Sequence, residues 1–280
     1  MKTLQLLNKA AAQLHCRNII SNRLDSEILL SKVLKIKREN LLTKLDLEID
    51  LEKIVEFNKL ILRRSLNEPV AYILKEKEFW SKSFEVSSDT LIPRPETELL
   101  VEKLVKIYQK KNINILDVGT GCGCIIISLL SELKKSRGTG IDISKKAINV
   151  AKKNARKFDV MNKIQFINIS LVNFFSKKFD LIVSNPPYIK NIDIKNLDNC
   201  IKHYEPKIAL DGGNDGLDVI KKVIYKANEI LKYNGLLALE IGNGQFKKVS
   251  TLLLKNLYRV EDIVKDHKNN IRCIIARKLF

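Results

Sequence analysis

Apolar residues recur at helical spacing over the first quarter of the chain. They lie three or four positions apart, which places their side chains on one face of a helix. Three segments show the pattern: Leu4, Leu7, Ala11 and Leu14; Leu24, Ile28, Leu29 and Val33; and Leu51, Ile54, Val55, Ile61 and Leu62. We therefore expect residues 1–75 to form a small helical domain that binds or orients a partner.

The pattern changes after residue 75. Residues 76–93 mix aromatic and β-branched residues with turn formers, which predicts a β-hairpin linker. The next helix is expected to begin near Pro95 and to reach about Lys110. Proline suits a first helical turn, and Glu96 and Glu98 complement the positive end of the helix dipole.

Strands and helices alternate from residue 113 onward. The expected strands are 112–118, 139–143, 163–169, 179–185, 235–242, 258–266 and 270–279, and the expected helices are 124–135, 144–158 and 215–232. Such alternation predicts a largely parallel sheet covered by helices on both faces. Residues 94–280 are therefore expected to form an α/β domain.

Composition supports a globular protein of two domains. The chain has 280 residues, of which 45% are apolar, and it contains no uncharged apolar run of about 18 residues. Its first residues lack the apolar core of a signal peptide. Five scattered cysteines have poor zinc spacing. We expect a cytoplasmic protein with no membrane contact and no metal.

The formal net charge of +18 raises the question of a nucleic-acid partner. Lysine far outnumbers arginine, and the positive charge is spread along the whole chain. Compositional bias produces this pattern, so nucleic acid is not expected to be a direct substrate. Attraction to an acidic or RNA-bound partner remains an alternative.

A glycine-rich loop lies between the first expected strand and helix of the α/β domain. It comprises Gly119, Thr120, Gly121, Cys122 and Gly123, and Asp142 ends the next strand 23 residues after Gly119. Glycines allow a ligand to approach the backbone closely, and a carboxylate at the next strand end can accept hydrogen bonds from a ribose diol. The loop lacks the Gly-Lys-Ser/Thr of a P-loop. A nucleoside site is expected here, the alternative being a plain tight turn.

The tetrapeptide Asn185-Pro186-Pro187-Tyr188 follows another expected strand. Prolines fix φ and remove backbone donors, which leaves nearby carbonyl groups as rigid acceptors. The Asn185 side-chain carbonyl and the Pro186 backbone carbonyl would each accept an N–H from a planar NH2 group, while Tyr188 packs against that group. This arrangement predicts methyl transfer to an amide or aromatic amine by positioning. The alternative is a turn that merely ends the strand.

Together these segments resemble the release factor glutamine methyltransferase family. The resemblance covers nearly the whole chain, in the family's order and spacing, and is carried by residues 78–81, 91–102, 115–125, 182–189 and 204–217. It implies a small N-terminal helical domain joined by a β-hairpin to a Rossmann-like, seven-stranded class I methyltransferase domain. It also implies S-adenosylmethionine as cofactor and, as substrate, the glutamine of a Gly-Gly-Gln motif in class-one peptide chain release factors.

The resemblance also assigns roles to residues. It implies that Gly119 to Gly123, Asp142, Ser170 and Asn185 bind the cofactor, that Asn185 to Tyr188 bind the glutamine amide, and that Asn185, Pro186 and Tyr188 are catalytic. Ile169 stands where the family commonly has an acidic residue, so backbone groups or Asn168 are expected to hold the adenine edge.

Other functions remain open. The Asn-Pro-Pro-Tyr motif is shared with nucleic-acid amino-methyltransferases, and a sister family methylates a glutamine of a ribosomal protein. The sequence at residues 94–98 favours the release factor. A non-catalytic RNA- or ribosome-binding protein with the same fold is the alternative from a different class.

Overall fold

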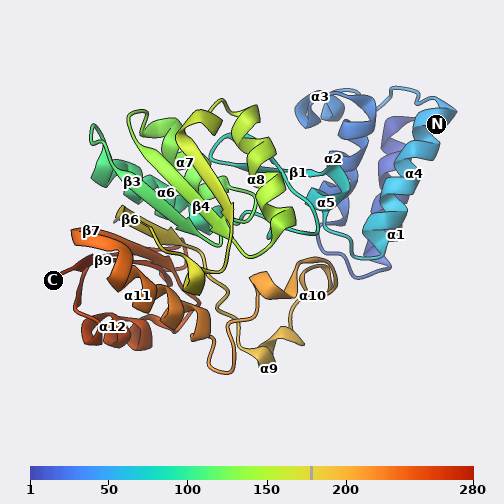
Figure 1. The fold of residues 1–280 in the computed structure, drawn as a ribbon. Coiled ribbons are helices and arrows are strands. Elements are labelled where there is room, and N and C mark those ends of the chain that lie inside the picture. The colour runs from blue at the N-terminus through green and yellow to red at the C-terminus, as the bar shows by residue number, and fades with distance from the viewer. Residues whose placement is uncertain (177–178) are drawn as a thin grey trace. The chain divides into compact units, whose positions relative to one another are not determined.

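A computed structural model describes residues 1–176 and 179–280 (Figure 1). Its contacts divide the chain into two compact units. The first consists of Met1–Glu76 and Asp198–Tyr204, and the second of Lys77–Leu197 and Glu205–Phe280. Among the described residues, no helix combines the length and apolar character needed to cross a membrane.

The first unit is a helical bundle. Its helices are α1 (Thr3–His15), α2 (Asn22–Leu34), α3 (Arg38–Leu42), α4 (Leu51–Ser65), α5 (Val70–Leu74) and α10 (Asn199–Tyr204). The core of this unit includes Leu7, Leu29 and Phe57, which are fully buried. Residues 198–204 belong to the same unit, in which the Tyr204 hydroxyl donates to the Leu66 carbonyl at 2.9 Å.

The buried faces of these helices differ in part from the predicted ones. Five residues expected on apolar faces are exposed: Leu4, Leu24, Leu51, Val55 and Leu62. In α4 the core contacts run along Ile54, Phe57 and Ile61, also three or four positions apart. The periodicity therefore predicted the helix and its core residues Ile54 and Ile61 correctly, but it also assigned exposed residues to the inner face, because apolar residues occur on both sides of the helix.

The second unit contains a seven-stranded sheet in the order β5-β4-β3-β6-β7-β9-β8. Its strands are β3 (Asn114–Val118), β4 (Arg137–Asp142), β5 (Ile164–Asn168), β6 (Phe179–Ser184), β7 (Leu231–Glu240), β8 (Tyr258–Lys265) and β9 (Ile271–Lys278). The five from β3 to β7 are parallel, and β9 is antiparallel to both β7 and β8. The predicted α/β fold with a seven-stranded sheet is confirmed.

Helices cover both faces of this sheet (Figure 1). One face packs against α6 (Pro95–Tyr108), α7 (Cys124–Glu132) and α8 (Lys145–Lys157), and the other against α11 (Asp218–Ile230) and α12 (Phe246–Lys255). Neighbouring residues alternate between the two cores: Ile115 faces the first and Leu116 the second. Alternation with both faces buried explains the nearly continuous apolar runs in the sequence.

All of the hairpin except its first residue, Glu76, belongs to the second unit. The hairpin consists of β1 (Glu76–Phe79) and β2 (Lys82–Glu85), and Phe79 and Phe84 are fully buried in the first of the two cores. The remaining short elements are α9 (Asn191–Ile194), η1 (Met161–Lys163), η2 (Leu171–Asn173) and η3 (Lys207–Ala209).

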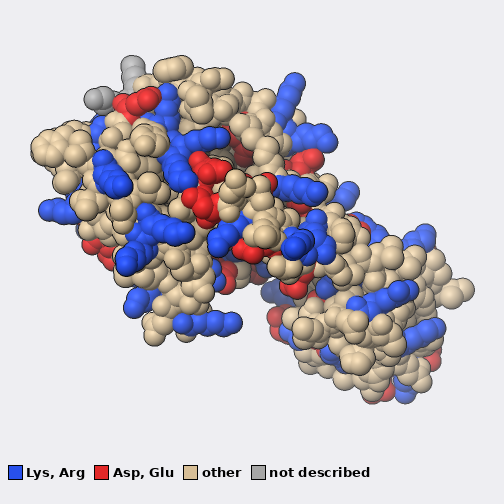
Figure 2. All heavy atoms as spheres, turned by 90° about the horizontal axis from the view of Figure 1, so that it is seen from below, with Lys and Arg blue, Asp and Glu red and all other residues tan. Residues whose placement is uncertain are grey.

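Positive charge is not gathered into one patch on the face of the molecule that Figure 2 shows. On the face shown in Figure 2, lysine and arginine side chains are interspersed with acidic and uncharged residues. None of the five cysteines forms a disulfide bond within residues 1–176 and 179–280. No group of His, Cys, Asp and Glu side chains in the same described part of the chain is arranged to hold a metal ion.

Candidate active site

A cavity of about 500 Å³ opens at the carboxyl ends of β3, β4, β5 and β6. Parallel strands bring their carboxyl ends to one edge of the sheet, where open α/β folds bind ligands. Of the residues predicted from sequence, the cavity wall contains Gly119, Thr120, Gly121, Cys122, Asp142, Ser170, Asn185 and Pro187. Gly123, Pro186 and Tyr188 lie outside that wall.

The glycine loop presents bare backbone to the cavity. Gly119 and Gly121 have φ of +71° and +55°, a region that glycine adopts without strain. A Cβ at Gly119 would meet no atom within 4 Å, so a side chain there would project into open space. Gly123 differs, because its Cβ would lie 2.8 Å from Ile127 Cδ1. The first two glycines leave room for a ligand, and the third allows close packing of α7.

A hydrogen bond to Asp142 connects this loop to the end of β4. The Asp142 carboxylate accepts hydrogen bonds from the Gly121 N–H at 3.0 Å and from the Ser144 N–H at 2.9 Å. Burial raises the pKa of Asp142, and these two hydrogen bonds act in the opposite direction. A carboxylate has about four acceptor positions, so Asp142 keeps capacity to accept from a ligand hydroxyl.

The end of β5 gives the cavity an apolar wall. Ile169, Leu171 and Val172 line it together with Ser170. Asn168, the alternative partner for an adenine edge, is exposed, and its Nδ2 donates to the Asp142 carbonyl at 2.9 Å. A flat apolar ring fits such a wall better than a charged group does.

The tetrapeptide after β6 is divided between the cavity and the interior. The Ser184 hydroxyl donates to the Val118 carbonyl at 2.7 Å and ties β6 to the end of β3. Asn185 and Pro187 then line the cavity, whereas Pro186 is buried. The Tyr188 hydroxyl donates to Glu240 at 3.3 Å.

A buried polar group lies behind Asn185: it joins Thr97 to Glu240, for which the sequence indicates a structural role or, alternatively, a place at the edge of the pocket. Thr97 and Glu240 are each 2% exposed, and the Thr97 hydroxyl lies 2.6 Å from Glu240 Oε2. The Asn185 Nδ2 donates to the Thr97 oxygen at 3.3 Å. Burial raises the pKa of Glu240 to about 7. A carboxylate within the apolar run 236–241 was the available signal, because such a residue needs polar partners.

A second pair, which sequence reasoning missed, lies at the rim of the cavity. Arg94, which lines the cavity, contacts Glu205 at 2.6 Å. The other oxygen of this buried carboxylate accepts the Ile92 N–H at 3.2 Å. The pair joins the segment before α6 to the segment after α10, although the two are far apart in sequence.

Asp117 places a further buried carboxylate beneath the glycine loop. Its Oδ2 accepts from the Thr120 hydroxyl at 2.8 Å. Its Oδ1 has no hydrogen-bond partner among the described residues. Burial raises the pKa of Asp117 to about 7. Asp117 is 1% exposed and lies outside the cavity wall, so its carboxyl supports the glycine loop from below.

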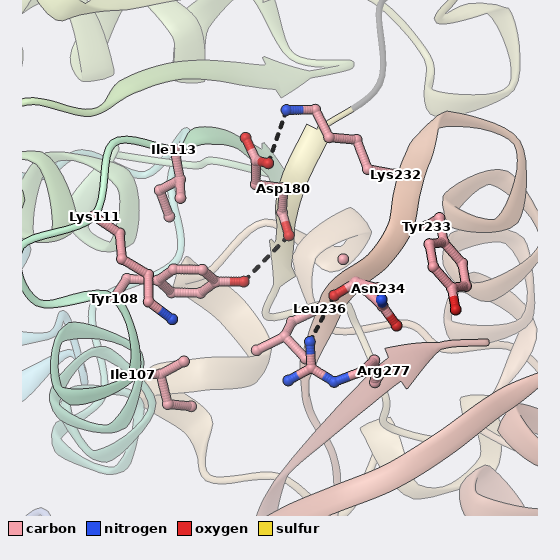
Figure 3. A pocket seen from close by; sticks show the side chains of 11 residues that line it. Ile107, Tyr108, Lys111, Ile113, Asp180, Lys232, Tyr233, Asn234, Leu236 and Arg277 are labelled. Carbon is pink, nitrogen blue, oxygen red and sulfur yellow. Dashed lines mark hydrogen bonds and ion pairs between the residues drawn. The ribbon is translucent and has the colours of Figure 1, made fainter. Parts of the chain in front are cut away.

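A smaller cavity of about 230 Å³ lies near the opposite, amino ends of β3, β6 and β7 (Figure 3). Its polar groups bond to one another. Lys232 pairs with Asp180 at 2.8 Å, Tyr108 donates to the Asp180 carbonyl at 3.2 Å, and Arg277 donates to the Asn234 carbonyl at 2.6 Å. The predicted site residues all lie away from this cavity, so the candidate active site is the larger one.

Two family models match the chain. They are the methyltransferase small domain, over residues 94–203, and the PrmC N-terminal domain, over residues 5–74. A release factor glutamine methyltransferase from Fusobacterium nucleatum subsp. nucleatum is 41% identical over 286 residues, which cover 99% of this chain and 79% of that protein. A second release factor glutamine methyltransferase, from Buchnera aphidicola subsp. Acyrthosiphon pisum, is 40% identical. The matched region covers 91% of this chain and 92% of that protein.

Other relatives are longer or more distant. A bifunctional methyltransferase from Rickettsia conorii is 36% identical over 97% of this chain, which spans 57% of that protein. Among solved structures, a methyltransferase from Pyrococcus furiosus has a TM-score of 0.55 at 18% identity, covering 80% of this chain and 98% of that one. This likeness shows the fold.

Proposed function

The chain belongs to the release factor glutamine methyltransferase family, and we propose that it methylates the side-chain amide nitrogen of the Gly-Gly-Gln glutamine in class-one release factors. One observation carries the proposal. In a chain about 40% identical to two such enzymes over nearly its whole length, Asn185 shares a cavity wall with the glycine loop and Asp142.

We propose S-adenosylmethionine as the cofactor, because the cavity residues fit it. When bound, this cofactor supplies an electrophilic methyl group. The open space at Gly119 and Gly121 admits a ligand against the backbone. Asp142 has the capacity to accept from a ribose diol, and the wall around Ile169 suits an adenine ring.

Asn185 would orient the target nitrogen. An amide nitrogen is a weak nucleophile because its lone pair is delocalised over the carbonyl group. An acceptor that binds one N–H of the target holds the nitrogen in place while the methyl group is transferred, and the proton can leave afterwards. We propose the Asn185 side-chain oxygen as this acceptor. The Pro186 carbonyl as second acceptor stays a prediction, because Pro186 is buried beside the cavity.

We further propose that the N-terminal unit orients the release factor and that the enzyme works in the cytoplasm, where translation takes place. The match to the PrmC N-terminal domain over residues 5–74 supports only the assignment of this unit to the same family. Nucleic acid is not proposed as a direct substrate.

Labelled S-adenosylmethionine offered separately with a release factor, a large-subunit ribosomal protein and duplex DNA tests the proposal. We expect label on the release factor, and mass spectrometry should place it on the Gly-Gly-Gln glutamine. Asn185→Ala should lower the rate of transfer by about 10²- to 10³-fold. Cofactor affinity should change little, because the glycine loop and Asp142 are proposed to supply most of the cofactor contacts. Label on the ribosomal protein or on DNA alone would contradict the proposed substrate.

A further inference from the structure

Three side chains from distant parts of the second unit form a chain of hydrogen bonds that ends at the cavity. Glu240 ends β7, Thr97 lies in the first turn of α6, and Asn185 follows β6. The Thr97 oxygen lies 2.6 Å from Glu240 Oε2 and 3.3 Å from Asn185 Nδ2. Thr97 and Glu240 are each 2% exposed, so water has little access to compete for these bonds.

The direction of each hydrogen bond follows from which groups carry a hydrogen atom to donate. Above about pH 7 the Glu240 carboxyl is ionised and only accepts, so at such pH values the single hydroxyl proton of Thr97 is donated to Glu240. The Thr97 oxygen can then only accept from Asn185. The Asn185 NH2 group must therefore face Thr97, and its oxygen is the amide atom left for the cavity.

Tyr188 supports the acceptor role of Glu240. Its hydroxyl donates to Oε1 at 3.3 Å, so each oxygen of the buried carboxylate has a hydroxyl donor. Arg272 favours the ionised form of Glu240 electrostatically, although burial opposes it.

This direction matters because an asparagine amide can rotate by half a turn with little change in shape. The rotated Asn185 amide would turn its NH2 group toward the NH2 group of the target, and two donors cannot form a hydrogen bond with each other. We propose that Thr97 and Glu240 are positioning residues that hold Asn185 with its oxygen toward the target nitrogen. The inference rests on the proposed function, since it requires a target that donates an N–H.

Thr97→Val tests the inference because it removes the hydroxyl and keeps the side-chain shape. Single-turnover transfer to the release factor should slow by about tenfold to a hundredfold, as expected for one lost polar contact. Affinity for S-adenosylmethionine, measured by calorimetry, should stay within about twofold, because the defect lies in orientation. Thr97→Ser is the matched control and should recover most of the rate, since it restores the hydroxyl.

Glu240→Gln should slow transfer by a similar factor. The NH2 group of the new glutamine can donate to the Thr97 oxygen, and the Thr97 hydroxyl is then free to donate to Asn185, which favours the rotated amide. The double variant Thr97→Val, Glu240→Gln should be no slower than the slower single variant, because Glu240 acts through Thr97. A wild-type rate in Thr97→Val, or losses that multiply in the double variant, would overturn the inference.

Nitrogen-15 NMR of the Asn185 side-chain amide provides a readout that needs no substrate. Its NH2 signals should shift in Thr97→Val and return toward wild-type values in Thr97→Ser. If Thr97→Val fails to fold, Thr97→Ala takes its place. Unchanged signals in a folded variant would refute the inference. A wild-type protein that labels no release factor would instead refute the proposed function, so the two failures are distinguishable.

Discussion

Replacing Glu240 with glutamine should make the stability of the protein less dependent on pH. The wild-type carboxyl is 2% exposed, and burial raises its pKa from 4.5 to about 7. Charges around it act in both directions: Arg272 lowers the pKa and Glu96 raises it. Because the folded state disfavours ionisation, this carboxyl supports stability below its unfolded pKa, and that support is lost as the pH rises through about 7.

The expected magnitude follows from the size of the shift. Each pKa unit corresponds to about 1.4 kcal/mol, so the rise from 4.5 to about 7 corresponds to about 3.5 kcal/mol in full. Of this, roughly 2.5 kcal/mol should be lost from the free energy of unfolding between about pH 5 and about pH 8. Glutamine has no such ionisation. The free energy of unfolding of Glu240→Gln, minus that of the wild type, should therefore rise by this amount over the same interval.

Urea unfolding at several pH values measures this difference. Asp117, whose pKa is also raised to about 7, is present in both proteins, so its contribution cancels in the subtraction. A difference that stays constant between about pH 5 and about pH 8 would refute the reasoning, because it would mean that Glu240 titrates alike in the folded and unfolded chains.

Further substitutions have equally definite outcomes. Arg94→Ala leaves the buried carboxylate of Glu205 without its ion-pair partner and should lower the free energy of unfolding by about 3 kcal/mol in urea titration; Arg94→Lys, which keeps a positive charge, should lose less. Gly119→Ala should weaken S-adenosylmethionine binding in calorimetry, because it places a methyl group in open cavity space at φ +71°; undiminished affinity would remove the loop from the cofactor site. Phe57→Ala should cost roughly 3–5 kcal/mol by leaving a void in the helical bundle, and a loss under about 1 kcal/mol would mean that Phe57 is not a core residue.

Much of the fold was predictable because its signals are local. The run 113–118 alternates residues between two buried faces and ends at a glycine, so its strand could be identified without knowledge of its neighbours. The helix α12 was missed. Of its ten residues only Val249 and Leu253 are buried, so its apolar stripe is too short to stand out.

In the candidate site too, residues with a local sequence signal were predictable and residues that meet only through tertiary packing were not. The glycine loop, Asp142 and Asn185 each lie at the carboxyl end of a strand. The rule that carboxyl ends of parallel strands share an edge was sufficient to group them. Thr97 and Glu240 are 143 positions apart, and only the completed sheet and α6 bring them together. Their relation depends on tertiary packing, which no short stretch of sequence contains.

The place of Glu240 in the chain has a consequence for synthesis on the ribosome. A nascent polypeptide that has emerged through residue 190 already holds the glycine loop, Asp142 and Asn185. It still lacks the carboxylate at residue 240, and also β9, which pairs with the strand that carries this carboxylate. The residues proposed to hold the cofactor are thus translated first, whereas the carboxylate proposed to orient Asn185 through Thr97 is translated later.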